Sequence, residues 1–157
     1  MIKTGIGYDV HQLADGQRLI IGGVEISSNF GSIGHSDGDV LLHAIVDALL
    51  GAAAMGDIGL LFPSEDQQWK DADSRIFLKT AMTKIRAAGY LINNVDGIVI
   101  LQQPKLRNYI QQMRQVIASI LGVNIEVISV KATTTDHLGF IGESKGIGAM
   151  AVVTLNQ

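Results

Sequence analysis

The first residues able to do chemistry are an aspartate and a histidine near the N-terminus, with one residue between them. Asp9 and His11 lie in a stretch whose composition favours a β-strand, and residues two apart on a strand point to the same face. A carboxylate oxygen and an imidazole nitrogen are ordinary zinc ligands. The pair taken alone also fits a capped strand end that carries a surface histidine.

A second candidate is His43, which lies in an apolar stretch that predicts a buried helix. Asp39 and Asp47 share its helix stripe, one turn before it and one turn after it. A buried histidine needs hydrogen-bond partners or a metal, so His43 is either a core histidine bonded to one of these acids or a metal ligand. With Asp9 and His11 it would form the open three-ligand set typical of catalytic zinc, and Asp47 would then fix the tautomer of its ring.

Two later segments combine hydroxyl, acidic and glycine residues. Asp57, between Gly56 and Gly59, would either accept hydrogen bonds from ligand hydroxyls or form an ordinary Asx turn. Three threonines at 133–135 precede Asp136. Their hydroxyls suit phosphate oxygens and the acid suits Mg²⁺ or Mn²⁺, although the β-propensity of threonine also explains the run. The chain has no Walker A lysine pattern, and Gly-x-Gly at 5–7 is too short for a dinucleotide-binding motif.

The elements that must position these residues follow from hydrophobic periodicity and from capping residues. We expect a turn or bulge at Gly22-Gly23 and a helix cap at Asp73 or Ser74. The predicted strands cover residues 2–10, 18–26, 95–102, 125–132 and 147–155. The predicted helices cover residues 75–88, 106–121 and the stretch from a cap at Ser36 or Asp37 to about Ala54, and the expected loops are 29–37, 56–72 and 136–144. This order predicts a single α+β domain over residues 1–157, with a mixed β-sheet and helices packed on one face.

The composition excludes several classes of protein. The 157 residues carry 12 Lys and Arg against 15 Asp and Glu, a net charge of −3 that disfavours nucleic-acid binding through a broad basic face. The absence of cysteine excludes disulfides and thiolate metal sites. No signal segment or membrane span is recognisable, so we expect a cytoplasmic protein. The charged fraction of 17% is low and favours burial of surface in an oligomer.

Four motifs in order carry a family resemblance: Asp-Val-His at 9–11, His-Ser-Asp-Gly-Asp at 35–39, Gly-Asp-Ile-Gly at 56–59 and Lys-Ala-Thr-Thr-Thr at 131–135. They resemble the 2-C-methyl-D-erythritol 2,4-cyclodiphosphate synthase family of the non-mevalonate isoprenoid pathway, over nearly the whole chain. The resemblance implies a homotrimer with active sites between subunits and no nucleic-acid or membrane partner. It implies a lyase in which the 2-phosphate of 4-diphosphocytidyl-2-C-methyl-D-erythritol 2-phosphate attacks the β-phosphorus. CMP then leaves and a cyclic diphosphate forms.

The resemblance also implies roles for individual residues. Asp9, His11 and His43 would hold Zn²⁺ or another divalent ion, and Asp136 would recruit Mg²⁺ or Mn²⁺ to the substrate diphosphate. His35 and Thr134 would stabilise the transition state. The implied substrate-binding residues are Asp9, Val10, His11, His35, Ser36, Asp57, Ile58, Gly59, Phe62, Pro63, Ser64, Glu65, Asp66, Leu101, Gln102, Gln103, Pro104, Lys105, Leu106, Arg107, Thr133, Thr134, Thr135, Asp136 and Phe140.

Three residues depart from the family pattern. Asp136 replaces the usual glutamate, and Ser64 replaces the usual aspartate after Phe-Pro. Glu143 replaces an arginine that many members place beside a trimer-axis cavity for isoprenoid diphosphates, which predicts weak or absent binding of such ligands here. Two alternatives to the lyase are a non-catalytic metal- or lipid-binding trimer on the same fold and a metal-dependent phosphohydrolase.

Overall fold

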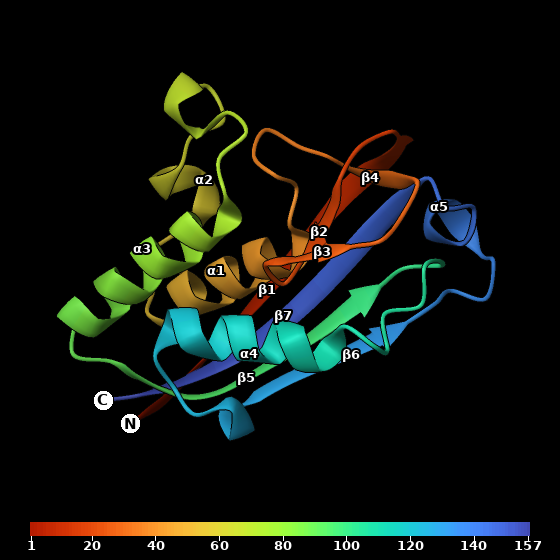
Figure 1. The fold of residues 1–157 in the computed structure, drawn as a ribbon. Helices are drawn as coiled ribbons and strands as arrows, with labels where there is room; N and C mark the ends of the chain where they lie inside the picture. The colour runs from red at the N-terminus through yellow and green to blue at the C-terminus, as the bar shows by residue number, and fades with distance from the viewer.

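A five-stranded mixed sheet forms the centre of the molecule in a computed structural model that describes all 157 residues (Figure 1). Its strands are β1 (Ile2–Asp15), β4 (Phe30–Ile33), β5 (Leu91–Ile100), β6 (Ile128–Thr133) and β7 (Gly146–Asn156). They are arranged in the order β4-β1-β7-β5-β6, in which only β5 and β6 are parallel. A separate hairpin joins β2 (Leu19–Ile21) to β3 (Val24–Ile26) through the expected turn at Gly22-Gly23.

Three longer helices lie on one face of this sheet (Figure 1). Helix α1 (Val40–Ala52) lies on β1 and β7, α3 (Ser74–Ala87) packs on α1, and α4 (Ile110–Leu121) packs on β6. The remaining helices are the short segments α2 (Ile58–Leu61), η1 (Gln67–Trp69), η2 (Ile125–Val127) and α5 (Gly139–Gly142). The predicted α+β class, with a mixed sheet and helices on one face, is confirmed. None of the helices has both the length and the apolar character that crossing a membrane requires.

Several predicted boundaries were wrong, and the largest error concerns residues 29–37. We expected a loop there, but Phe30–Ile33 forms β4, which pairs with the second half of β1 and extends that strand to Asp15. Gly31 favoured the loop prediction. In the structure a Cβ at Gly31 would lie 2.0 Å from the carbonyl oxygen of Arg18, so glycine is needed because β4 passes close to a neighbouring backbone.

The helices differ from prediction mainly at their starts. Helix α1 is capped by Asp39, not by Ser36 or Asp37, and α4 begins at Ile110 instead of residue 106. Helix α3 has the expected cap, Asp73. The segments expected to be loops at 56–72 and 136–144 contain the short helices α2, η1 and α5, whose single turns are too brief to give a periodic signal.

Two glycines of β1 allow α1 to lie directly on the sheet. A Cβ at Gly5 would lie 2.0 Å from the carbonyl oxygen of Ala48, and one at Gly7 would lie 1.9 Å from that of Ala44. No real Cβ could occupy either position, so the Gly-x-Gly spacing serves a backbone contact between strand and helix. The same contact brings the predicted metal ligands of β1 close to the one on α1.

The opposite face of the sheet carries exposed apolar side chains. Ile6 and Tyr8 of β1 are 64% and 59% exposed, while Met150 and Val152 of β7 are 38% and 37% exposed. The strand register places Ile6 beside Val152 and Tyr8 beside Met150, so the four form one apolar surface. Within a single chain nothing covers this surface, which is the pattern of a buried interface in an assembly.

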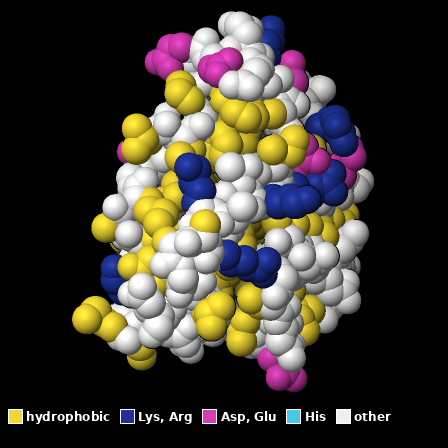
Figure 2. All heavy atoms as spheres, turned by 90° about the vertical axis from the view of Figure 1, so that its left-hand side faces the viewer, with side chains coloured by type: hydrophobic (Ala, Val, Ile, Leu, Met, Phe, Trp, Pro, Cys, Tyr) yellow, Lys and Arg dark blue, Asp and Glu magenta, His cyan; other side chains and the backbone are white.

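Basic side chains do not gather into one broad patch on the face shown in Figure 2. There the Lys and Arg side chains lie in several separate places among hydrophobic and uncharged groups. On this face, therefore, no continuous stripe of positive charge is present along which a phosphate backbone would bind.

Asp39 joins the β2–β3 hairpin to the start of α1. Its carboxylate is fully buried, with Oδ1 accepting from the N–H groups of Gly22 at 2.9 Å and Leu42 at 3.0 Å, and Oδ2 accepting from the N–H of Gly23 at 2.6 Å. Burial raises the pKa of Asp39 to about 6, while the hydrogen bonds from Gly23 and Leu42 act in the opposite direction. The group is therefore ionised at neutral pH and works as a three-bond acceptor.

Replacing Asp39 by alanine is expected to lower the free energy of unfolding by about 2–4 kcal/mol, because it removes a helix cap and leaves three buried N–H groups without an acceptor. Urea unfolding followed by circular dichroism measures the change. The control is Asn124→Ala, which removes the exposed cap of η2 and is expected to cost less than about 1 kcal/mol. Equal small losses in both variants would contradict this assignment.

Candidate metal centre and substrate cavities

Asp9 and His11 of β1 and His43 of α1 bring three potential ligand atoms together. Asp9 Oδ2 lies 2.9 Å from His11 Nε2 and 3.0 Å from His43 Nδ1, and the two nitrogens are 3.2 Å apart. A tetrahedral ion with bonds of about 2.0–2.1 Å holds its ligand atoms roughly 3.3 Å apart. The three side chains therefore enclose a space that fits such an ion, and a three-ligand set leaves the fourth position open.

The two histidines perturb the titration of Asp9, and Asp9 perturbs that of His11. Burial alone would raise the pKa of Asp9, but hydrogen bonds from His11 and His43 outweigh it and lower the pKa to about 2. Burial alone would lower the pKa of His11, but the hydrogen bond and charge of Asp9 outweigh it, and the pKa is raised. Asp9 is thus a permanent carboxylate, and His11 in the metal-free protein retains a proton to higher pH than an ordinary histidine.

The raised pKa of His11 predicts a pH-dependent zinc affinity. A proton and a metal ion compete for the same nitrogen, so affinity should fall as the pH decreases through this raised pKa. The decrease should begin at a higher pH than for a histidine with the ordinary value of about 6.5. Chelator competition between about pH 5 and 8 measures the curve. An affinity that stays constant over this range would contradict the prediction.

The predicted partners of His43 were wrong. Asp47 forms no hydrogen bond with its ring; instead, Asp47 Oδ1 accepts from the N–H of Ile58 at 2.7 Å, at the start of α2. The carboxylate of Asp39 instead accepts hydrogen bonds from the N–H groups of the β2–β3 hairpin turn. The partner of His43 Nε2 is Ser74 of α3, whose Oγ lies 2.8 Å away. Helix spacing identifies which residues share a stripe, but it does not say which neighbouring element meets that stripe.

A cavity of about 200 Å³ lies beside the three ligands. Phe62 and Phe77 stack on its wall with ring centroids 4.4 Å apart, and Trp69 packs edge-on against both. Trp69 and Phe77 were not predicted as site residues, because Phe77 has the spacing of an ordinary core residue and Trp69 lies in an expected loop. The lining residues are His11, His35, Ser36, His43, Ile58, Gly59, Phe62, Ser64, Trp69 and Phe77.

A second cavity of about 440 Å³ lies between the end of β6 and the segment before α4. Two cations, Lys105 and Arg107, line it together with the hydroxyl residues Thr133 and Thr134. Its other lining residues are Leu101, Pro104, Leu106, Ile110 and Ala132, of which Ile110 and Ala132 were not predicted. The two cavities share no residue, so one chain presents the candidate metal ligands in one place and the cationic and hydroxyl groups in another.

The remaining predicted residues lie outside both cavities. Asp57 and Asp66 cap α2 and η1, and the carbonyl oxygen of Asp66 lies 3.3 Å from His35 Nε2. Asp136 is exposed and linked to Thr134, whose Oγ1 lies 3.3 Å from Asp136 Oδ1 and 3.2 Å from its backbone N–H. The full set outside the cavities is the metal-ligand candidate Asp9 together with Val10, Asp57, Pro63, Glu65, Asp66, Gln102, Gln103, Thr135, Asp136 and Phe140.

The fold and the three converging side chains define an α+β protein with an open Asp/His/His centre suited to a divalent metal ion. The family model for the YgbB family matches residues 2–156, and the chain belongs to this family.

Relatives and solved structures agree with this membership. The chain is 52% identical over 157 residues to the 2-C-methyl-D-erythritol 2,4-cyclodiphosphate synthase of Carboxydothermus hydrogenoformans, covering 100% of this chain and 96% of the relative. The bifunctional IspDF of Campylobacter jejuni has 44% identity and a TM-score of 0.95, and the match covers 99% of this chain and 42% of that one. The CDP complex of IspF from Plasmodium falciparum has 40% identity and a TM-score of 0.86, covering 98% of this chain and 95% of that one.

Proposed function

We propose that the chain converts 4-diphosphocytidyl-2-C-methyl-D-erythritol 2-phosphate into 2-C-methyl-D-erythritol 2,4-cyclodiphosphate and CMP. An oxygen of the 2-phosphate forms a new bond to the β-phosphorus. The bond from that phosphorus to the bridging oxygen breaks, and the oxygen leaves with CMP. No water is consumed and no protein nucleophile is needed. The observation that carries the proposal is the converging Asp/His/His set in a chain about half identical, over its full length, to named synthases.

The metal-binding and cavity-lining residues would have different roles in this reaction. Asp9, His11 and His43 would hold zinc, and Asp136 would hold Mg²⁺ or Mn²⁺. When bound, these ions would act as Lewis acids on the diphosphate oxygens and keep the reacting groups in line. His35 lines the cavity beside the ligands, which supports a role in stabilising the charge that develops on the transferring phosphoryl group.

The second cavity supports recognition of the cytidyl and phosphate part of the substrate. Its volume of about 440 Å³ lies within the usual range of ligand pockets, roughly 300–1,000 Å³. Lys105 and Arg107 supply positive charge there, and Thr134 supplies a hydroxyl beside Asp136. That a related structure is a CDP complex further supports a cytidine nucleotide as the occupant.

We further propose a homotrimer in which each active site combines the metal ligands of one subunit with the Lys105 cavity of its neighbour. Two observations support this. The two cavities share no residue although one substrate must reach both. The apolar surface of β1 and β7 also needs a cover that a second copy would supply.

Phosphorus NMR with the substrate and a divalent ion tests the activity. Release of CMP together with a cyclic diphosphate is the expected result. Ring-opened phosphate products would instead indicate the phosphohydrolase, and absence of turnover would indicate the non-catalytic trimer. The synthase relatives do not support that last alternative.

Mixed oligomers test whether an active site spans two subunits. His43→Ala and Thr134→Ala are each expected to be nearly inactive alone, because each damages a different half of the site. Randomly mixed in equal amounts, they should regain about a quarter of the wild-type activity, since one site in four then combines two intact halves. Steady-state CMP release after co-refolding measures the recovery.

The matched control for this experiment mixes His43→Ala with His11→Ala. Both substitutions damage the same half, so no intact site can form and no activity should return. If the His43→Ala and Thr134→Ala mixture is no more active than its parents, the site lies within one subunit.

A further inference from the structure

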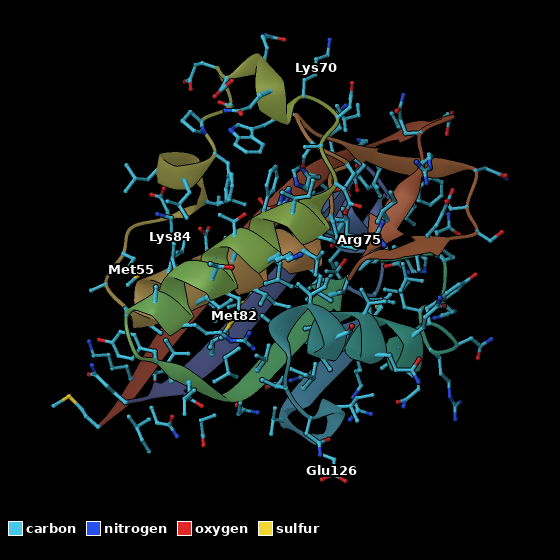
Figure 3. The ribbon with its side chains drawn as sticks, turned by 60° about the vertical axis from the view of Figure 1, so that its left-hand side comes forward. Met55, Lys70, Arg75, Met82, Lys84 and Glu126 are labelled. Atoms are coloured by element: carbon cyan, nitrogen blue, oxygen red, sulfur yellow. The ribbon has the colours of Figure 1, made fainter.

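Ser74 connects the candidate metal centre to an acid that no role above uses. It is the first residue of α3 and is fully buried, and the next residue in the sequence, Arg75, is labelled in Figure 3. Its Oγ lies 2.8 Å from His43 Nε2. Its backbone N–H donates to Asp37 Oδ2 at 3.0 Å, and its hydroxyl donates to Asp37 Oδ1. A continuous chain of contacts thus runs from Asp37 through Ser74 to His43.

The position of Asp37 is fixed by backbone contacts as well as by Ser74. Its N–H donates to the carbonyl oxygen of Ala72 at 3.0 Å, and its Oδ1 also accepts the N–H of Asp39 at 3.2 Å. The carboxylate is therefore held in one place, facing the start of α3.

Counting donors and acceptors fixes the direction of each hydrogen bond. A carboxylate only accepts, so the hydroxyl proton of Ser74 points to Asp37. The lone pairs of Ser74 Oγ are left for His43, and Nε2 must then carry the proton. With Nε2 protonated, Nδ1 is the nitrogen left to bind an ion, and it faces Asp9 Oδ2 and His11 Nε2, 3.0 and 3.2 Å away.

We propose that Asp37 and Ser74 are positioning residues that hold His43 in the Nε2–H tautomer and so prepare Nδ1 as a metal ligand. The inference rests on the proposed metal-binding function of Asp9, His11 and His43. Groups that orient a ligating histidine in this way typically change metal affinity by about 10–100-fold when they are removed.

Two substitutions separate this role from simple packing. Ser74→Ala removes the acceptor and leaves Nε2 with only Ser36 Oγ, 3.2 Å away, which can either donate or accept. Asp37→Asn keeps the shape of the side chain but replaces one hydrogen-bond acceptor by an NH₂ donor. The amide has one oxygen where the carboxylate had two, so it can accept the N–H of Ser74 or the N–H of Asp39 but not both. When it accepts the N–H of Ser74, the amide NH₂ faces Ser74 Oγ, and the hydroxyl then donates to Nε2 of His43. That arrangement favours the Nδ1–H tautomer, which places a proton where the metal would bind.

The test measures the tautomer and the zinc affinity separately. Nitrogen-15 NMR of the metal-free protein at about pH 8 compares the share of Nε2–H at His43 in the wild type with that in each variant. It should show a shift toward Nδ1–H in Asp37→Asn and a mixture in Ser74→Ala. Chelator competition should give zinc affinities about 10-fold weaker for Ser74→Ala and about 10–100-fold weaker for Asp37→Asn.

Ser32→Ala is the matched control, because Ser32 is a buried serine whose Oγ has no hydrogen-bond partner. Its zinc affinity and the His43 tautomer should equal those of the wild type. The proposal is overturned if both variants keep the wild-type tautomer and bind zinc as tightly as the wild type. If the wild-type protein itself bound no zinc, the proposed function would fail instead, while the NMR result would still decide the tautomer.

Discussion

Replacing His43 by alanine is expected to abolish stoichiometric zinc binding and to lower kcat by at least about 10³-fold. The imidazole is one of only three protein ligands, and a metal that polarises a phosphoryl oxygen contributes several kcal/mol to transition-state stabilisation. His43 is 8% exposed and lines the aromatic cavity. Metal analysis of the purified protein and the phosphorus NMR assay measure the two losses.

His137→Ala is the control for zinc stoichiometry, because that exposed imidazole lies outside the ligand set. It should retain zinc as the wild type does. Full zinc occupancy in His43→Ala would reject the Asp/His/His centre.

Replacing Gly7 by alanine is expected to prevent folding or to lower the free energy of unfolding by more than about 3 kcal/mol. The new Cβ would lie 1.9 Å from the carbonyl oxygen of Ala44 and 2.9 Å from the N–H nitrogen of Ala48. Both neighbours are backbone atoms of α1 and cannot move aside as a side chain would, so the helix would have to lift from the sheet. Urea unfolding and the yield of folded protein measure the effect.

Gly51→Ala is the matched control for Gly7→Ala. Gly51 lies within α1, and its new Cβ would meet only the carbonyl oxygen of Ile6, 3.9 Å away. This substitution should leave stability unchanged or raise it by about 0.5–1 kcal/mol, because alanine favours the helix over glycine. Similar losses in the two variants would show that the close contact of strand and helix has no special cost.

The ligands of the candidate centre could be predicted from sequence, but their hydrogen-bond partners could not. Asp9 and His11 share a strand face, and His43 lies on an apolar helix, so residue types and local spacing were informative. Asp47 was assigned to His43 because the two share a helix stripe, yet its carboxylate accepts the N–H of Ile58 at the start of α2. The actual partner, Ser74, comes from a helix whose packing on α1 is a tertiary contact without any local signal.

The fold shows the same division between local and distant information. The cap at Asp73 and the turn at Gly22-Gly23 were predicted because each depends on residues close in sequence. Strand β4 was missed because it pairs with the end of β1, and this pairing joins residues that are distant in sequence, such as Gln12 and Ile33. Sequence motifs also could not reveal that the two cavities of one chain are separate, because a motif does not specify the distance between residues in the folded chain.

The close contact between β1 and α1 has a consequence for the choice of ion. Ca²⁺ prefers six to eight oxygen ligands at about 2.3–2.6 Å, and it would need the ligand atoms to move apart. Backbone meets backbone at Gly7 and Ala44, so the strand and the helix cannot adjust their spacing by rearranging side chains. The centre should therefore discriminate by ionic size, accepting small tetrahedral ions and rejecting larger ones even where those are more abundant.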